Sequence, residues 1–404
     1  MQAVADPRVF KMRPERQKAV KGCLRYTRIK FGIFLSGLSV FAQLYLFQPM
    51  LTLLCKEFNI TPAHSSLAVS ACTVGMATGL FLFAFKADRF PRKKLMVSSM
   101  IISTILTLIS AAVRNFELLI AINFLKGMVL SGVSAVALAY LSEEVDAKSL
   151  GQSISLYLAG NTMGGMMGRV GATLMSGWWG WQWATVGIGA GSLALGLVFA
   201  HVFPKSRHFT PARVQTRRKL EHMGQFLRDP LIVRLYFVAA LIMGAFVSVY
   251  NYLGFRLEGA PFYLPHYLIA FIFLMYTTGV AGSLVTGKWS DRHPADKILR
   301  VFMLLLVPGL LFLLTKSVGL IIIGLGIFTF AFFGAHTMAS KMVAQQAKQG
   351  KSTATSLYWL FYYLGSSLLG SSTGIALQKW NWEIFIGVLF MLVLGSLLLV
   401  KPKK

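Results

Sequence analysis

Two short stretches carry the same Asp-Arg pair directly after a long apolar segment: Ala84-Phe-Lys-Ala-Asp-Arg-Phe-Pro-Arg-Lys-Lys94 and Gly287-Lys-Trp-Ser-Asp-Arg292. The two pairs lie 203 residues apart, and two further strings recur at a spacing of 201 residues. Those strings are Ser155-Leu-Tyr157 with Ser356-Leu-Tyr358, and Trp179-Gly-Trp181 with Trp380-Asn-Trp382. Three matches near one spacing predict that the chain consists of two duplicated halves.

The composition places both halves in a membrane. Of the 404 residues, 55% are hydrophobic and 13% are charged, and the mean hydropathy is +0.63; soluble domains are about 25% charged. Apolar stretches of about 20 residues, enough to cross a bilayer as a helix, recur along the chain. We expect an all-α integral membrane protein with twelve transmembrane helices, at residues 29–50, 63–86, 94–113, 118–141, 150–174, 182–203, 231–254, 266–288, 297–316, 318–340, 353–376 and 383–400.

A basic segment, 204–230, divides these spans six and six. We expect six-helix bundles at 29–203 and 231–400 joined by this linker, with basic tails at 1–28 and 401–404. Because each half has an even number of spans, the halves share one orientation and are related by an axis along the membrane normal. This arrangement predicts a cavity between the halves near the middle of the membrane.

The positive charge indicates the orientation of the chain. The net charge is +26, and 33 of the 40 Lys and Arg fall in the tails and the loops on one side of the predicted spans. The positive-inside rule therefore predicts that both termini lie in the cytoplasm. The surplus charge is expected to lie against anionic lipid head groups, which accounts for it without a nucleic-acid partner.

The two Asp-Arg stretches resemble the loop signature of the major facilitator superfamily. The strings Tyr140-Leu-Ser-Glu-Glu144 and Asn161-Thr-Met-Gly-Gly-Met-Met-Gly-Arg169 are similar to YnfM-type bacterial inner-membrane permeases, which are grouped with sugar and drug efflux proteins. The resemblance covers nearly the whole chain. It implies the fold of that superfamily, a monomer, and proton-coupled efflux of a small molecule by alternating access.

The loop after the second span is a candidate gate. Asp88 can accept hydrogen bonds from a neighbouring helix N-terminus, which the resemblance implies is that of span eleven. Arg89 and Arg92 can pair with Glu143 or Glu144 after span four and close the cytoplasmic face. The alternative is a solvated turn that obeys the positive-inside rule. The equivalent residues of the second half are Asp291 and Arg292.

Span five carries a polar stripe that ends in a cation. Tyr157, Asn161 and Arg169 are spaced by multiples of four and share one face. Because Arg169 is costly to expose to lipid, we expect it in the cavity, or alternatively directed to the outer head groups. The spacing of 201 places Tyr358 and Tyr362 on the equivalent stripe of span eleven. An adjacent strip of small residues is expected to serve helix packing: Gly160, Gly164 and Gly168.

Three more polar residues inside spans complete the candidate substrate site. Asn123 and Lys126 lie one turn apart in span four, where Lys126 either faces the cavity or reaches the outer surface. Gln43 of span one is either a site residue or a helix contact. A cavity with Lys126 and Arg169 is positive, which favours a substrate with a carboxylate or phosphate. A sugar or polyol bound by Asn, Gln and Tyr is the alternative.

The coupling proton has few possible carriers. All fourteen Asp and Glu fall in loops or at span ends. His336 of span ten is the ionisable group well inside a span that titrates near neutral pH. It is either the proton carrier or a hydrogen-bonded helix contact. Glu143 and Glu144 are the rival carriers.

These features predict a secondary active transporter and argue against an enzyme. We find no nucleophile with a base inside a span, no metal-ligand spacing among Cys23, Cys55 and Cys72, and no glycine loop for a nucleotide. No cofactor or metal is expected. The alternatives to efflux are an uptake symporter or uniporter for an organic anion or sugar, and a sensor that keeps the fold without transport.

Overall fold

A computed structural model of the chain describes residues 18–209, 216–347 and 349–400. The outer parts of the predicted tails, residues 1–17 and 401–404, and linker residues 210–215 lie outside this description, as does the side chain of Asp88. The N half comprises α1 (Leu24–Leu44), η2 (Gln48–Met50), α2 (Leu51–Phe58), α3 (Pro62–Ser65), α4 (Leu67–Lys86), η3 (Ala87–Arg89), α5 (Arg92–Ser110), α6 (Phe116–Glu144) and α7 (Ala147–Val202).

The C half begins after a helix within the predicted linker, α8 (Thr216–Arg228). It comprises α9 (Pro230–Glu258), η4 (His266–Met275), α10 (Tyr276–Trp289), α11 (Ala295–Phe312), α12 (Val318–Gln346), α13 (Lys351–Ser372), α14 (Gly374–Lys379) and α15 (Trp382–Leu399).

Twelve membrane-crossing segments are confirmed, although α7 contains two of them. Gly180 interrupts α7 with φ 83° and ψ 165°, a conformation that favours glycine, and thereby separates the predicted fifth and sixth spans. Nine helices of the described residues are long and apolar enough to cross a membrane by themselves, with α7 counted once. The remaining two spans are α11, which carries three charges near its start, and α13, which is rich in Ser and Tyr.

Two spans are less regular than the sequence predicts. The first was expected to end near residue 50, but α1 ends at Leu44 because Tyr45 leaves helical geometry at φ −110° and ψ 19°. The short η2 helix, with Pro49 in its first turn, then leads into α2. The eighth span begins as the 3₁₀ helix η4 before continuing as α10.

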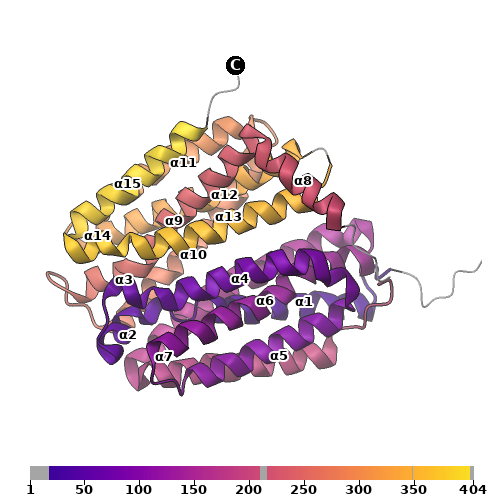
Figure 1. Cartoon of the computed structure of the whole chain (residues 1–404), viewed down its shortest axis with the longest axis horizontal. Coiled ribbons are helices and arrows are strands. Elements are labelled where there is room, and N and C mark those ends of the chain that lie inside the picture. The colour runs from indigo at the N-terminus through magenta and orange to yellow at the C-terminus, as the bar shows by residue number, and fades with distance from the viewer. Residues whose placement is uncertain (1–17, 210–215, 348, 401–404) are drawn as a thin grey trace, which may run out of the picture.

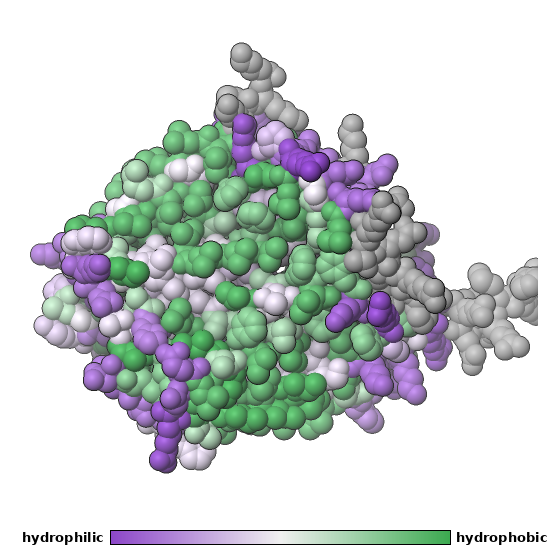
Figure 2. Space-filling model, in the orientation of Figure 1, coloured by the Kyte–Doolittle hydropathy of each residue, from purple (hydrophilic) through white to green (hydrophobic). Residues whose placement is uncertain are grey.

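The two halves lie side by side with their helices nearly parallel (Figure 1). We call the end that carries α8 the linker side, and the end that carries α2, α3 and α14 the far side. Between the halves, α4 packs on α13 and α7 packs on η4. Apolar side chains cover the middle of the visible face and hydrophilic ones gather at its two ends, as expected for a protein embedded in lipid (Figure 2).

The hydrogen bonds between spanning elements of the two halves lie toward the far side. Ser70 of α4 contacts the hydroxyl of Ser371 in α13 at 2.6 Å, and Thr73 contacts that of Ser367 at 2.6 Å. Both serines lie in the last two turns of α13, and Ser70 lies near the start of α4. The far side of the interface is therefore closed by direct contacts in this structure.

Candidate functional site

The glycine strip of α7 brings this helix onto the backbone of α1. A Cβ added at Gly160 or Gly164 would overlap the carbonyl oxygen of Phe34 or Leu38, and one added at Gly168 would meet the Cα of Ala42. Such close approach allows dense packing between helices in lipid, where the hydrophobic effect does not drive association. The strip fixes the rotation of α7 and so determines where its polar stripe points.

Arg169 is the central cation of the interface. It is 3% exposed, with Nε donating to Gln48 Oε1 at 2.6 Å and one terminal nitrogen donating to Gly165 O at 2.6 Å. Its guanidinium lies 4.2 Å from the ring centre of Tyr45 in the N half and 4.6 Å from that of Tyr276 in the C half. Aromatic faces attract a guanidinium but do not neutralise it. No carboxylate pairs with Arg169 among the described residues.

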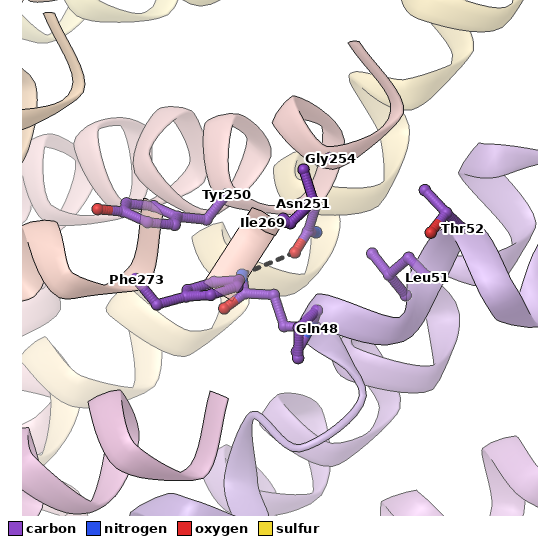
Figure 3. Close-up of a pocket in the computed structure, with 9 residues that line it drawn as sticks. Gln48, Leu51, Thr52, Tyr250, Asn251, Gly254, Ile269 and Phe273 are labelled. Atoms are coloured by element: carbon purple, nitrogen blue, oxygen red, sulfur yellow. Dashed lines mark hydrogen bonds between the residues drawn. The ribbon is translucent and has the colours of Figure 1, made fainter. Parts of the chain in front are cut away.

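Gln48 connects Arg169 to the other half. Its amide nitrogen donates to Asn251 Oδ1 at 2.8 Å (Figure 3). Asn251 in turn donates to the carbonyl of Gly370 at 3.1 Å. Gln48 and Asn251 also line a cavity of about 10 Å³, close to the volume that one water requires. Thr52 and Phe273 lie on its wall. Arg169 therefore belongs to a polar network that joins α7, η2, α9 and α13.

Lys126 and Asn123 lie inside the N half with no polar partner among the described residues. Both side chains are 0% exposed, and neither the ammonium of Lys126 nor either amide atom of Asn123 has a hydrogen bond. The ammonium lies 4.9 Å from the ring centre of Phe47, which directly precedes Gln48. A buried polar group without a partner is costly. This part of α6 therefore adds a second basic side chain, one without a polar partner among the described residues, near the Arg169 network.

The other predicted residues of the N half have neighbours within that half. Gln43 donates to Ser39 O at 3.2 Å and accepts from Thr107 at 2.9 Å. The hydroxyl of Tyr157 lies 3.3 Å from that of Ser134. Asn161 lies against Gly37 of α1, and its Oδ1 is buried without a partner among the described residues.

An aromatic cluster in the C half surrounds His336. Nδ1 of His336 lies 2.8 Å from the hydroxyl of Tyr358, and its ring centre lies 4.8 Å from that of Tyr362 and 5.3 Å from that of Trp359. The structure thus brings together a predicted proton carrier and two predicted substrate residues. Trp359 was not predicted, because its position beside Tyr358 carries no periodic signal of its own.

Sequence reasoning also missed the partners of Arg169. Asn251 contacts Gln48 rather than Arg169, and it stands 203 residues after Gln48, which is the spacing of the two Asp-Arg pairs. Tyr45 follows the end of α1 and Tyr276 begins α10, where neither helical spacing nor the repeat identifies them. Their only signal is a polar atom within a span, which many helix contacts share. The geometry of the interface is what selects them.

Two acidic residues organise the linker side of the N half. Arg92 contacts Glu143 through Nε at 3.1 Å and a terminal nitrogen at 2.8 Å. Glu144 is fully buried, pairs with Arg25, lies 3.0 Å from His208 Nδ1 and accepts from the backbone N–H of Arg207 and His208. These pairs lie within one half and tie the start of α1 and the segment after α7 to the end of α6. In the second loop, Asp291 and Arg292 are exposed.

Glu144 is expected to contribute strongly to stability. Glu144→Ala should lower the free energy of unfolding by about 3 kcal/mol, because it removes the anion that Arg25 and two backbone N–H groups share in a buried position. Glu117→Ala is the matched control, since Glu117 is 71% exposed and should change stability by less than about 0.5 kcal/mol. Unfolding in detergent, followed by intrinsic tryptophan fluorescence, measures both; equal midpoints would contradict the assignment.

Two six-helix bundles related by an internal repeat, with a buried polar network at their interface, define the class of secondary transporters built from parallel repeats. The Major Facilitator Superfamily model matches residues 33–370. The chain belongs to this superfamily, whose members are membrane transporters and not enzymes.

Relatives and solved structures agree with this assignment. The chain is 33% identical to the inner membrane transport protein YnfM of Escherichia coli, over 94% of this chain and 91% of YnfM. It is 35% identical to an uncharacterized transporter of Buchnera aphidicola (Schizaphis graminum), over 95% and 93%. A bacterial homologue of the lysosomal transporter Spinster, solved in an inward-facing unoccupied conformation, superposes with a TM-score of 0.75 at 15% identity, covering 94% of this chain and 95% of that structure.

Proposed function

We propose that the chain is a secondary active transporter of the bacterial inner membrane that moves a small organic anion by alternating access. The observation that carries this proposal is the buried, carboxylate-free position of Arg169 between Tyr45 of one half and Tyr276 of the other. A guanidinium remains charged under all physiological conditions. A substrate with a carboxylate or phosphate would supply the missing negative charge and could form the bidentate bonds that guanidinium favours.

The aromatic cluster of the C half would hold the rest of the substrate. Tyr358, Trp359 and Tyr362 offer ring faces and hydroxyl groups, which suit a planar or partly apolar body. A sugar phosphate or an aromatic carboxylate fits this combination. A neutral sugar is the second candidate, because the site also offers the amides of Gln48 and Asn251.

We further propose that transport is proton-coupled efflux, with linker side and both termini cytoplasmic. The positive-inside rule supports the orientation. The resemblance to efflux permeases supports the direction. We favour His336 as the proton carrier because it lies beside Tyr358 and Tyr362. Its rivals Glu143 and Glu144 are engaged by Arg92 and Arg25 on the linker side. We propose that the protein acts as a monomer among membrane lipids.

Liposomes that contain the purified protein and a pH-sensitive dye test the function. We expect proton movement when an organic carboxylate or phosphate is added, and a much smaller response to cationic drugs. His336→Gln should abolish the proton movement, whereas tryptophan fluorescence should still detect substrate binding, weakened by the lost contact with Tyr358. Silence of the oriented, folded protein across carboxylates, phosphates, sugars and cations would refute proton-coupled transport and favour a uniporter, another coupling ion or a sensor.

A further inference from the structure

A chain of hydrogen bonds on the far side crosses between the halves twice. Ser176 of α7 contacts Nε2 of His266 in η4 at 3.1 Å, and Nδ1 of His266 lies 2.7 Å from Oε1 of Glu258 at the end of α9. Thr52 of α2 donates to the same carboxylate oxygen at 3.0 Å. Because α2 and α7 belong to the N half and α9 and η4 to the C half, the His266–Glu258 pair is held between two elements of the opposite half.

The hydrogen bonds of this chain depend on how many protons His266 carries. The Ser176 hydroxyl has one hydrogen, which it donates to Thr173 O at 3.2 Å. In that arrangement it accepts from His266 Nε2, whereas a neutral Nε2 would instead accept the Ser176 hydrogen and the bond to Thr173 would be lost. Nδ1 faces a carboxylate oxygen that already accepts from Thr52, so Nδ1 must also donate. Both ring nitrogens donate only in the imidazolium form.

The pair is enclosed, and the described charged residues toward the far side of α2, α9 and α7 are exposed or have other contacts. The side chains of His266 and Glu258 are 11% and 14% exposed. On α2, Lys56 is exposed and Glu57 accepts from Gln182 at 3.3 Å. On α9, Arg256 lies over the ring of Phe262 at 5.4 Å. On α7, Arg169 is engaged by Gln48 and Gly165.

Within the part of the chain that the structure describes, no other histidine–carboxylate pair lies at the interface. His64 pairs with Glu117, and His208 pairs with Glu144, each inside the N half. Thr52 also lines the small cavity next to Gln48, so this pair adjoins the Arg169 network. The sequence offered no sign of it, because Glu258 and His266 stand at the two ends of an irregular loop.

We propose that His266 is a proton-binding gate that closes the far side of the interface. Protonated, it donates to Glu258 and Ser176 at once and holds the halves together. Neutral, it has one donor, so either the Ser176–Thr173 bond or the contact between the halves is lost. Histidine ordinarily changes charge between pH 5 and 8. When the protein is open to the far side, a proton that binds His266 from that side therefore favours closure of the far side. In an efflux cycle, this closure is the step that follows release of the substrate.

This inference deepens the alternating-access proposal, and a distance measured without substrate tests it separately from transport. Spin labels at Arg114→Cys and Lys316→Cys, in exposed far-side loops of the two halves, report far-side closure in nanodiscs once Cys23, Cys55 and Cys72 are replaced by alanine. Between pH 8 and pH 5.5 we expect the ratio of closed to open populations to rise roughly tenfold, as charge-assisted bonds form.

His266→Gln should abolish this pH response and leave a larger open population at both pH values. Glu258→Gln, a second variant with the same expected result, keeps the test decisive if the first does not fold. His64→Gln is the matched control, because His64 also faces a far-side carboxylate but within one half, and it should respond like the wild type. A wild-type response in His266→Gln and Glu258→Gln, or no response in the wild type, would overturn the gate. If the wild-type protein shows the expected pH-dependent closure but moves no substrate in liposomes, the transport proposal is refuted and the gate proposal stands.

Discussion

Arg169→Ala is expected to lower the apparent affinity for an anionic substrate by at least about 100-fold, or about 3 kcal/mol. The guanidinium is the buried cation at the interface that lies between rings of both halves, and alanine removes its charge and the two hydrogen bonds that it donates to Gln48 and Gly165. The measurement is proton movement in liposomes, titrated with whichever carboxylate or phosphate drives the wild type. Arg169→Lys keeps the positive charge but lacks the planar set of donors, so it should lower the apparent affinity less than Arg169→Ala does.

Two further variants separate the site from the interface. Arg114→Ala removes an exposed far-side arginine and should leave the affinity unchanged. Gln48→Leu breaks the link from Arg169 to Asn251 while keeping the guanidinium, so it should alter the rate more than the affinity. An unchanged affinity in Arg169→Ala, with the protein folded in detergent, would exclude Arg169 from the substrate site.

The fold could be predicted because lipid imposes a strong pattern on the sequence. Each span requires about 20 apolar residues, and the repeated strings near a spacing of 201 reveal the two halves. The break inside α7 could be placed near residue 180, because two glycines and three tryptophans at residues 177–181, residues typical of a membrane interface and of a turn, separate the two apolar stretches. The 3₁₀ start of η4 could not be predicted, because its residues are as apolar as those of a regular helix. At η2 the signal was Pro49, but a proline alone does not show where α1 ends.

The site was predictable only where residues share one helix. Helical spacing placed Tyr157, Asn161 and Arg169 on one face, but it could not show that Arg169 meets Tyr276 of the other half. The contact of His336 with Tyr358 depends on the relative rotation of α12 and α13, which hydropathy does not encode. Contacts between the halves also depend on the conformation of the carrier. The sequence does not indicate which contacts form when the carrier is open to one side of the membrane and which form when it is open to the other.

The packing of α7 on α1 provides the second large expected effect. Gly164→Leu should destabilise the protein by about 3 kcal/mol or prevent its folding, because a Cβ at this position already overlaps the carbonyl oxygen of Leu38. Gly191→Leu is a matched control in the same helix, since no atom lies within 4 Å of a Cβ added there. Thermal unfolding in detergent measures both variants.

The two substitutions also separate packing from helix propensity. Leucine is a better helix former than glycine, so Gly191→Leu should leave stability unchanged or raise it by up to about 1 kcal/mol. Gly164→Leu gains the same helix propensity, so a loss of stability in this variant means that its steric cost exceeds that gain. Equal midpoints for the two variants would show that α1 can move away from α7 at little cost. In that case the rotation of the polar stripe, and with it the position of Arg169, would not depend on the glycine strip.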